Sequence, residues 1–507
     1  MDPRGGCNVS LLGIDVGTTG CKAVVFDEEG KQVASAYQEY DLRAPQPRQA
    51  ELDSEDVWNR IKETIAAAAS KADRKDPIEA LSVTSMGEAV VPVGAGGEIL
   101  GPSILNVDIR GEAQIDPFRQ RVSERELYDV NGNVLANQYT LPKLMWLKEN
   151  ERELYDRTSR FLLWGSFVSY KLGAEACVDY SLANRTLLFD LQSEVWSERM
   201  LETGGIDREK LPRPVPAGTR IGTVSDAVAE ELGLPKKTSI VMGAHDQCAN
   251  SVGAGSVEAG MAMYGMGTFP TITPVYSARP ETGAMIDLGL NTEHHAIPGL
   301  WVSFIYHMGG ASIKWFRDHV GGSREASYKE LFREMPEEIG PVLVLPHFAP
   351  MGPPDYIADS TGVIVGLTTE TSRGAILRGI IEANALALKR VVRRLPYIGV
   401  TLDELRVVGG GSRSPEALQI NADILGTPVA RPAVDEAGAL GAAILAGAGI
   451  GRYDSAAEAS RAVVRVEERV EPDPEAMERY GELFERYEEL RKLVVPFTQE
   501  WTKGKLP

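Results

Sequence analysis

The chain has 507 residues, and at roughly 150 residues per domain this length predicts about two to four domains. The formal net charge is −19 and the sequence has no basic stripe, which argues against a nucleic-acid-binding protein. The four cysteines lie far apart and form no CxxC pair. This spacing disfavours a disulfide framework or a thiolate zinc site and favours a reducing compartment.

Two features of the sequence bear on membranes. The first ten residues, MDPRGGCNVS, lack the apolar core of a signal peptide. The longest weakly polar stretch, residues 437–450, is rich in Gly and Ala and is too short to span a bilayer. We therefore expect a cytoplasmic protein without a membrane partner.

The first predicted elements are strands around a Gly/Thr turn. Apolar runs at 11–15 and 22–27 flank the sequence VGTTG, which is typical of a β-hairpin, and residues 31–40 predict a third strand. Residues 54–70 have apolar positions at helical spacing, and Ser54 can cap that helix. Residues 78–83 predict a buried strand, and α/β alternation continues to about residue 250.

The second half repeats this pattern. Strands predicted at 239–244, 259–264 and 269–276 include a second Gly/Thr turn, GMGT, between the last two. The repeat predicts two similar α/β domains around a cleft, over residues 1–254 and 255–455. Residues 456–507 are charged and have a helical pattern, so we expect a C-terminal helical extension on the surface.

The first motif with a chemical meaning is GIDVGTTGCK at 13–22. Gly17 allows a close backbone approach, and the turn NH groups with the Thr18 and Thr19 hydroxyls can hold phosphate oxygens. Asp15 can hold a hydrated Mg²⁺ on those phosphates, and Lys22 adds a positive charge if it points inward. The alternative is an ordinary Gly-rich hairpin with an exposed aspartate.

The second motif is GAHDQ at 243–247, which follows an apolar strand. Phosphoryl transfer to a hydroxyl needs positioning, charge neutralisation and one base. Asp246 is the candidate base, and Gln247 could bond a neighbouring sugar hydroxyl. His245 is either a second candidate base or a structural histidine.

The third motif is VVGGGSRSP at 407–415, a strand that runs into a glycine turn and a helix. Ser414 suits the N-cap and Pro415 the first helical position. A glycine turn that leads into a helix N-terminus, here with Gly410 and Gly411, can hold a nucleotide or anion. The alternative is a tight turn without a ligand.

These three motifs, in this order and at these separations, resemble the FGGY family of carbohydrate kinases over about residues 10–455. Further segments are similar to family signatures: KLMWLKEN at 143–150, LGAEACVDYSLANRTLLFD at 172–190, NADILGTPVARP at 421–432 and EAGALGAAILAG at 436–447.

The resemblance implies two domains of the actin-like ATPase (ribonuclease H-like) fold, with ATP and sugar meeting in the cleft. It implies that Asp246 is the catalytic base, that Asp15, Thr18 and Thr19 form the phosphate and magnesium site, and that Asp15 and Asp246 are the metal ligands. The nucleotide and second phosphate-hairpin positions that it implies are Gly267, Thr268, Gly310, Gly410, Gly411 and Ser414.

The acceptor pocket is where the sequence departs from relatives. Where glycerol kinases have Arg-Glu and xylulokinases Met-His, this chain has SMGEA, so Met86 and Glu88 are candidates. Asn106 replaces a tryptophan that usually precedes the Asp-x-Arg motif, here Asp108 to Arg110. That Asp-Arg pair either faces the cleft or is a surface salt bridge. Gln138 is a further pocket candidate.

Fewer aromatic and more polar groups suit a longer polyhydroxy substrate better than glycerol. We therefore expect a ketopentose such as xylulose as the acceptor, with a sugar acid, an alditol or a deoxyketose as alternatives. Two hypotheses of another class remain: an actin-like ATPase that serves a protein partner, and a non-catalytic sugar sensor. A homodimer is compatible with the sequence.

Overall fold

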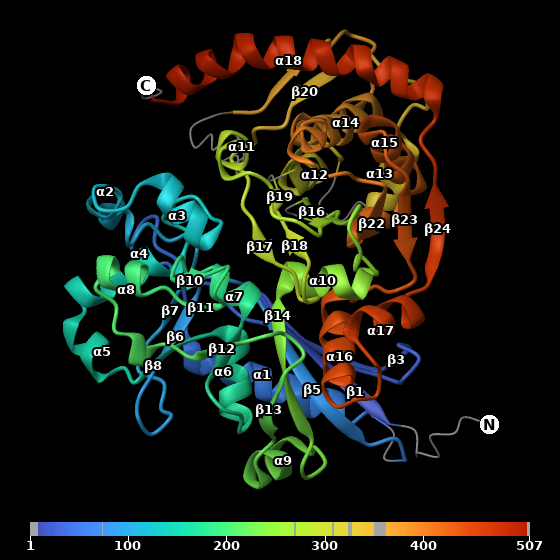
Figure 1. Ribbon diagram of the computed structural model, residues 1–507. Helices are drawn as coiled ribbons and strands as arrows, with labels where there is room; N and C mark the ends of the chain where they lie inside the picture. Colours follow the sequence, from blue (N-terminus) through green and yellow to red (C-terminus); the bar gives the residue numbers. More distant parts are fainter. Residues whose placement is uncertain are drawn as a thin grey trace.

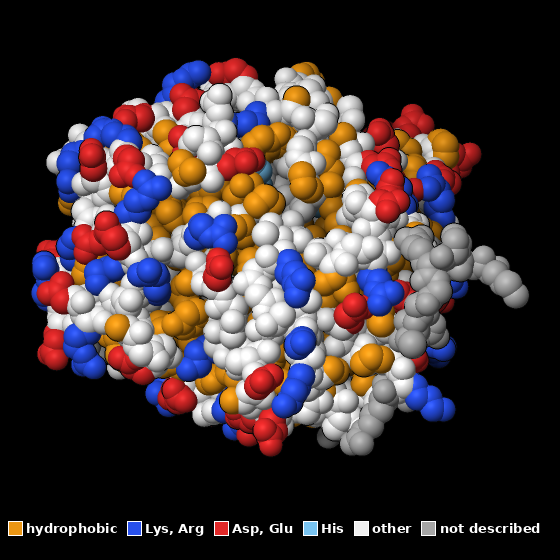
Figure 2. Space-filling view, turned by 60° about the horizontal axis from the view of Figure 1, so that its bottom comes forward, with side chains coloured by type: hydrophobic (Ala, Val, Ile, Leu, Met, Phe, Trp, Pro, Cys, Tyr) orange, Lys and Arg blue, Asp and Glu red, His pale blue; other side chains and the backbone are white. Residues whose placement is uncertain are grey.

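A computed structural model of the protein describes residues 9–72, 75–267, 270–306, 309–322, 327–348 and 361–503. Two mixed β-sheets, each flanked by helices, form two lobes (Figure 1). None of the described helices is long and apolar enough to cross a membrane. On the face shown in Figure 2, basic and acidic side chains are interspersed.

The first sheet has the order β13-β14-β5-β1-β2-β3. Its central strand β1 pairs antiparallel with β2, and β1, β5 and β14 run parallel. The predicted hairpin and buried strands are confirmed. The strands are β1 Ser10–Val16, β2 Gly20–Phe26, β3 Gln32–Glu39, β5 Ile78–Ser85, β13 Arg220–Thr223 and β14 Ser239–His245.

The second sheet repeats this topology. Its strand β15 pairs antiparallel with β16, and β15, β22 and β23 run parallel. The order is β17-β18-β16-β15-β22-β23-β24, with β19 paired to β16. The predicted repeat of two α/β halves is therefore confirmed. The strands are β15 Met261–Gly265, β16 Thr271–Tyr276, β17 Glu293–His294, β18 Trp301–Val302, β19 Ile305–Tyr306, β22 Glu404–Val408, β23 Val429–Pro432 and β24 Val466–Val470.

Helices cover both sheets. Those of the first half are α1 Ser54–Ala69, α2 Ile115–Arg119, α3 Glu124–Asn131, α4 Thr140–Asn150, α5 Arg152–Arg157, α6 Trp164–Leu172, α7 Tyr180–Asn184, α8 Glu198–Gly204, α9 Asp226–Leu232 and α10 Asp246–Ala254. Those of the second half are α11 Thr282–Asp287, α12 Gly309–His319, α13 Tyr328–Arg333, α14 Arg373–Val392, α15 Pro415–Leu425, α16 Ala437–Gly449, α17 Ala456–Val463 and α18 Pro474–Lys503.

Short strands form small two-stranded sheets and bridges outside the two main sheets. They are β4 Glu51–Leu52, β6 Val90–Val93, β7 Ser103–Ile104, β8 Arg160–Leu163, β9 Cys177–Asp179, β10 Phe189–Asp190, β11 Val195–Trp196, β12 Arg213–Val215, β20 Leu343–Leu345 and β21 Val363–Val365.

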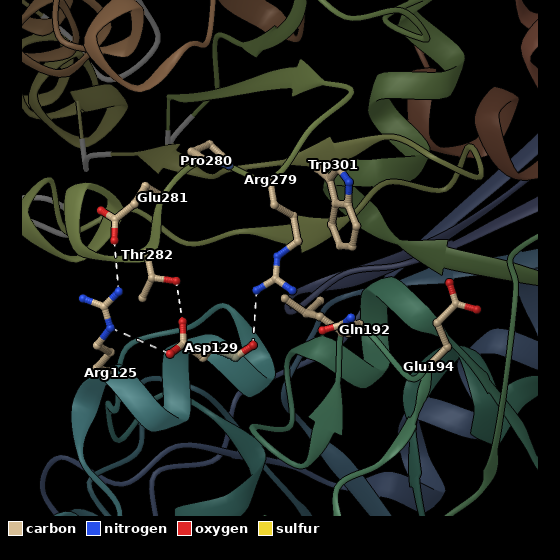
Figure 3. Close-up of a pocket in the computed structure, with 10 residues that line it drawn as sticks. Arg125, Asp129, Gln192, Glu194, Arg279, Pro280, Glu281, Thr282 and Trp301 are labelled. Atoms are coloured by element: carbon tan, nitrogen blue, oxygen red, sulfur yellow. Dashed lines mark hydrogen bonds and ion pairs between the residues drawn. The ribbon is translucent and has the colours of Figure 1, made fainter.

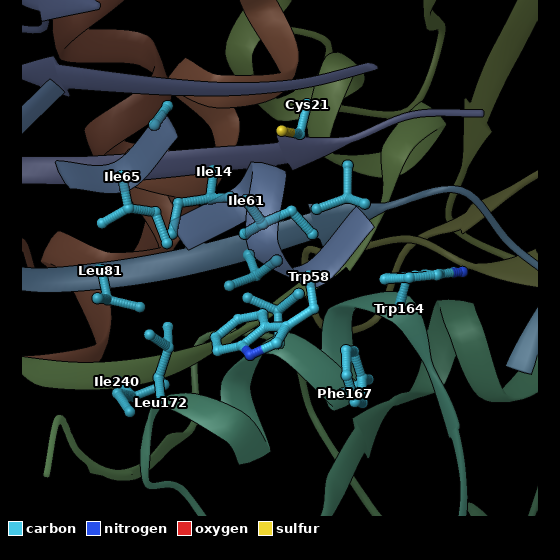
Figure 4. Packing of buried hydrophobic residues seen from close by; sticks show 14 of the residues in the cluster. Ile14, Cys21, Trp58, Ile61, Ile65, Leu81, Trp164, Phe167, Leu172 and Ile240 are labelled. Atoms are coloured by element: carbon cyan, nitrogen blue, oxygen red, sulfur yellow. The ribbon is translucent and has the colours of Figure 1, made fainter. Parts of the chain in front are cut away.

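The core of the first lobe lies between its sheet and helices α1 and α6. Figure 4 shows Trp58 of α1 facing Phe167 of α6, beneath Ile14 and Leu81 of the sheet. The Trp58 and Phe167 rings meet edge to face, with centroids 5.9 Å apart and planes at 79°. This geometry suits the quadrupoles of the two rings and fixes α1 against α6 beside the sheet.

The N-cap of α1 differs from the prediction. Asp53 caps the helix by accepting hydrogen bonds from the backbone N–H groups of Glu55 and Asp56, at 3.0 and 3.1 Å. The hydroxyl of Ser54 is buried and has no hydrogen-bond partner among the described residues. The prediction of Ser54 was wrong by one residue because Asp53 has the extended backbone, φ −70° and ψ 104°, that a cap requires.

The C-terminal segment is more than a surface helix. Strand β24 pairs antiparallel with β23 and extends the second sheet, and α18 buries Tyr480, Phe484 and Tyr487 in the core of the second lobe. The expectation of an entirely helical extension was therefore wrong, because the sequence VEERV forms an edge strand.

Helix α16 returns from the second half of the chain to pack on the first sheet. A Cβ added at Gly13 of β1 would lie 1.8 Å from the carbonyl oxygen of Ala439. A Cβ added at Gly253 of α10 would lie 1.9 Å from the carbonyl oxygen of Ala437. Backbone therefore contacts backbone at both crossings, and glycine is required at both positions.

Candidate active site

The candidate base and the candidate phosphate site lie at the same edge of the first sheet. Strands β1, β5 and β14 run parallel, with Asp15 opposite Thr84 of β5, and His245 opposite Ser85. The carboxyl ends of parallel strands form the usual ligand-binding edge of an open α/β sheet. Asp15, the loop after β5 and Asp246 therefore converge, as the sequence predicted for Asp15 and Asp246.

Asp246 is the first residue of α10, and its side chain is 27% exposed. Burial raises its pKa to about 7, and the negative charges of Asp15 and Glu88 add to this effect. A carboxylate whose pKa lies near neutrality is suited to accept a hydroxyl proton.

His245 is buried directly before Asp246, with its Nε2 3.3 Å from Asp246 Oδ1. Burial and the nearby Arg185 guanidinium lower the pKa of His245 well below its ordinary value. An imidazole that resists protonation is a weak base, so this arrangement favours the structural role over the base role that the sequence left open.

Asp15 lies at the end of β1 against the start of α16. A Cβ at Gly438 would lie 2.9 Å from Asp15 Oδ2 and 3.3 Å from Asn250 Oδ1. Burial raises the pKa of Asp15 to about 6; Lys22 opposes this shift and Glu436 adds to it. A carboxylate held here, with no ion pair among the described residues, is a suitable ligand for a cation.

The turn after β1 is tight and open to solvent. The N–H of Gly17 donates to the carbonyl of Gly20 at 2.9 Å, and the Tyr40 hydroxyl donates to the same carbonyl at 3.0 Å. Thr18 and Thr19 are exposed at its tip. Both hydroxyls are therefore free to meet a ligand in the cleft, as a phosphate-binding turn requires.

A pocket of about 280 Å³ joins this hairpin to the second lobe. Lys22 and Gly410 line it together, with Arg431, Asp435 and Glu436. The Lys22 ammonium binds the Glu436 carboxylate at 2.6 Å, so the cation points inward but is already paired. The structure thus brings the first and third motifs together from opposite ends of the chain.

The other predicted nucleotide positions have structural roles or lie apart from this pocket. The N–H of Gly411 donates to Met266 O at 3.0 Å, and the Ser414 hydroxyl caps α15 by accepting from Ala417 N at 3.2 Å. Gly267 is exposed at the end of β15, and Gly310 lies in the first turn of α12. Thr268 lies outside the described residues.

On the acceptor side, Glu88 projects from the loop after β5. It has a positive φ of 62° and is 5% exposed. Its Oε1 accepts from Arg185 Nε at 2.7 Å. Met86 is buried in the same loop, and its N–H donates to Val16 O at 2.9 Å, which fixes the loop against β1.

Gln138 and Gln247 lie nearer the cleft. Tyr306 of the second lobe donates to Gln138 Oε1 at 3.3 Å. Gln138 lines a cavity of about 10 Å³, about the size of one water molecule, together with Arg185, Asn291 and Phe304. Gln247 is half-buried beside Asp246 and hydrogen-bonds it.

The Asp-Arg pair is placed differently. Asp108 is 0% exposed, and Arg110 and the N–H of Ala50, at 2.7 Å, bind its carboxylate. These bonds hold the pKa of Asp108 below its ordinary value despite burial. The two residues form an ion pair, as in the alternative to a cleft-facing residue, but the pair is buried and is not the surface salt bridge of that alternative. Asn106 is half-buried in the preceding turn.

A larger hollow, of about 820 Å³, lies elsewhere, between α3 and residues 279–282 (Figure 3). An ion pair between Arg125 and Glu281, at 3.1 Å, crosses it, and so does a hydrogen bond that Arg279 donates to the backbone oxygen of Asp129 at 3.2 Å. None of the predicted site residues lines it. We place the active site at the strand ends because the convergent carboxylates and the glycine turn are there.

Two such α/β lobes, with carboxylates at the strand ends and a glycine turn facing them, define the actin-like class of phosphotransferases. Residues 10–253 match the N-terminal domain of the FGGY family of carbohydrate kinases, and residues 291–450 match its C-terminal domain. The chain therefore belongs to the FGGY family of carbohydrate kinases, enzymes that transfer a phosphoryl group to an alcohol.

Similar proteins cover nearly the whole chain. A glycerol kinase of Polaromonas sp. is 31% identical over 89% of this chain and 92% of that protein. A xylulose kinase of Lactococcus lactis subsp. lactis is 26% identical over 95% of this chain and 96% of that protein.

Solved structures agree on the fold. A xylulose kinase from Rhodospirillum rubrum superposes with a TM-score of 0.85 at 26% identity, over 96% of this chain and 99% of that one. A Plasmodium falciparum glycerol kinase with ADP has a TM-score of 0.84 at 21% identity, over 96% of this chain and 99% of that one.

Sequence reasoning missed three residues of this region: Arg185, Glu293 and Glu436. Arg185 lies within the segment LANRTLLFD, which was noted as a family signature without a role for its arginine. Glu436 directly precedes α16, where its carboxylate meets Lys22 from 414 positions away. No local sequence pattern predicts the contacts of Arg185 with its carboxylates or of Glu436 with Lys22.

Proposed function

We propose that this carbohydrate kinase transfers the γ-phosphoryl group of ATP to a hydroxyl of a neutral polyhydroxy acceptor, a ketopentose such as xylulose. The observation that carries the proposal is the convergence of Asp15, Glu88 and Asp246 at the ends of parallel strands. In this arrangement Asp15 serves the phosphates, Glu88 binds an acceptor hydroxyl, and Asp246 accepts the proton of the reacting hydroxyl.

Charge pairing supports a neutral acceptor over a sugar acid. Arg185 is bound by the carboxylates of Glu88 and Glu293, and Arg110 by those of Asp108 and Glu51. Lys143 donates to the backbone oxygen of Asp108 and to Asn137 Oδ1, and burial lowers its pKa to about 7. An acidic acceptor would find both arginines already paired and Lys143 already hydrogen-bonded, and it would meet the carboxylates of the site.

In this proposal Asp246 accepts the proton of the acceptor hydroxyl while the oxygen attacks the γ-phosphorus in line. Gln247 and Glu88 hold neighbouring hydroxyls. The NH groups of Thr18 and Thr19 hold the transferring phosphoryl group, and the pocket at Lys22 and Gly410 holds the nucleotide. Closure of the two lobes excludes water and limits ATP hydrolysis.

A magnesium ion fits this donor set. Burial raises the pKa of Asp15 and that of Asp246, and the charge of Asp15 raises the pKa of Asp246 further. No cluster of three or more metal-ligating side chains occurs in the described chain, but Mg²⁺ on nucleotide phosphates needs one or two protein carboxylates. When bound, the ion would neutralise charge on the β- and γ-phosphates.

The test is ADP release with ATP and Mg²⁺ against xylulose, ribulose, gluconate, glycerol, an alditol and a deoxyketose. Glycerol belongs in the panel because a glycerol kinase is among the similar proteins. The proposal expects the highest kcat/KM with a ketopentose. Preference for gluconate would refute the neutral acceptor, and ATP hydrolysis that no acceptor stimulates would favour the actin-like ATPase.

A further inference from the structure

A buried ion triad lies beside the candidate base and crosses between the lobes. Arg185, at the end of α7, donates from Nε to Glu88 Oε1 at 2.7 Å and from Nη1 to Glu293 Oε1 at 2.6 Å. The exposed fractions of the three residues are 7% for Arg185, 5% for Glu88 and 0% for Glu293. Burying three charged groups costs free energy of desolvation, so we looked for a functional role that these groups could have beside the candidate base.

Glycine at position 87 makes room for the triad. A Cβ at Gly87 would lie 3.0 Å from Arg185 Cγ and 3.0 Å from His245 Nε2. The space beside Glu88 is therefore filled by the stem of Arg185, which arrives from elsewhere in the chain. The guanidinium lies over the Tyr139 ring at 4.9 Å and the Phe304 ring at 5.5 Å, so its orientation is fixed on both sides.

The strand that carries Glu293 is itself attached to the first lobe. In β17 the N–H of His294 donates to Asn184 Oδ1 at 3.0 Å, and next to it the N–H of Thr292 donates to Gly132 O at 2.8 Å. The Tyr128 hydroxyl donates to Leu290 O at 2.8 Å. Glu293 is thus a fixed part of the acceptor side although it belongs to the second sheet.

The geometry points to Arg185 and Glu293 as specificity-determining residues for the acceptor, a reading that rests on the proposed function. Arg185 orients Glu88 so that its Oε1 is occupied and its other oxygen serves an acceptor hydroxyl. Glu293 adds a second negative charge to the pair of Arg185 and Glu88, which gives the triad a net charge of −1, so the site selects a neutral polyol over a carboxylate. Arg185 acts on the acceptor through Glu88, which makes it a positioning residue.

The charge balance predicts a direction for each variant. Glu293→Gln keeps the shape of the side chain and an oxygen that can accept a hydrogen bond from Arg185, but it removes one negative charge from the triad. The kcat/KM for an acidic acceptor should therefore rise relative to that for a neutral one. Arg185→Met leaves Glu88 without its partner, so the KM for a neutral acceptor rises. Arg185→Lys keeps the charge without the fork that bonds both carboxylates.

Tyr128→Phe is the matched control. It removes buried hydrogen bonds from the Tyr128 hydroxyl to Leu290 and Thr292, just before β17, without changing charge or touching Glu88 or Arg185. We expect Tyr128→Phe to leave acceptor preference unchanged even if it lowers thermal stability. Melting temperatures of all variants show which of them are folded.

The experiment measures kcat and KM of the wild type and these variants with xylulose and with gluconate. We expect Glu293→Gln to raise the gluconate-to-xylulose ratio of kcat/KM at least ~10-fold over Tyr128→Phe. We expect Arg185→Met to raise the KM for xylulose ~10-fold while the KM for ATP stays within about twofold, with partial recovery in Arg185→Lys.

The inference would be overturned if the wild type were active and the folded Glu293→Gln variant had the same gluconate-to-xylulose ratio of kcat/KM as Tyr128→Phe. The proposed function would not be affected by that result. The inference would also be overturned if Arg185→Met lost kcat/KM equally for both acceptors and for ATP, because equal losses would indicate a structural role for Arg185. A wild type that turns over neither xylulose nor another neutral acceptor would overturn the proposed function and this inference with it.

Discussion

Replacing Gly253 by alanine tests how the candidate base is positioned. Gly253 lies in α10, the helix that begins with Asp246, where that helix crosses α16. The added Cβ would lie 1.9 Å from Ala437 O and 2.8 Å from Gly441 N. Real Cβ atoms essentially never come within 3.0 Å of another atom and make ordinary contacts from 3.4 Å, so the two helices must separate by about 1.1–1.5 Å.

This displacement has two consequences. Overpacking of a close-packed contact costs about 1–3 kcal/mol, which lowers the urea midpoint and the melting temperature. A shift of about 1 Å at the base costs on the order of 10²-fold in kcat, because phosphoryl transfer depends on alignment. Urea unfolding and steady-state kinetics measure both effects.

Gly481→Ala is the control, because a Cβ at this position in α18 meets no atom within 4 Å. It should stabilise the protein by about 0.5–1 kcal/mol through helix propensity and leave kcat unchanged. If Gly253→Ala were as stable and as active as Gly481→Ala, the backbone contact between α10 and α16 would not position the base.

Three further predictions follow from charges at the site. Burial raises the folded pKa of Asp15 to about 6 and of Asp246 to about 7. Their protonation therefore stabilises the metal-free protein at low pH, and that stability is lost as the pH rises through 6–7. We expect Mg²⁺ to raise the melting temperature more at pH 8 than at pH 5.5, and an equal effect at both would contradict the site. Lys22→Met should raise the KM for ATP several-fold but not that for the acceptor, because Lys22 lines the nucleotide pocket. If the acceptor KM rose instead, the pocket assignment would be wrong. Asp108→Asn should cost about 3 kcal/mol in urea unfolding, since it breaks a buried ion pair. A loss of acceptor affinity without a loss of stability would instead indicate that Asp108 contacts the substrate.

The sequence predicted the parts of the fold that local chemistry determines. Gly/Thr turns between apolar runs identified both hairpins, and Ser414 before Pro415 identified the cap of α15. The N-cap of α1 was misplaced by one residue, because Asp53 and Ser54 are both capping types and only the backbone distinguishes them. Strand β24 was missed, because the charged residues in VEERV hide an edge strand.

The site residues that lie in sequence motifs could be predicted, whereas the contacts between residues far apart in the sequence could not. Asp15 and Asp246 follow strands, so their convergence could be expected from topology. Arg185 binds carboxylates 97 and 108 positions away, and such pairs leave no local pattern. Asp108 and Arg110, two positions apart, could be predicted as a pair but not as a buried one.

Turnover by Asp246→Asn tests the central claim most directly. Wild type and variant are compared with the best acceptor, and binding of that acceptor and of ATP is measured calorimetrically. Because the amide is nearly isosteric but cannot take a proton at neutral pH, we predict that kcat falls at least ~10²-fold while both ligands still bind. Near-normal turnover by the folded variant would contradict the assignment of Asp246 as the base.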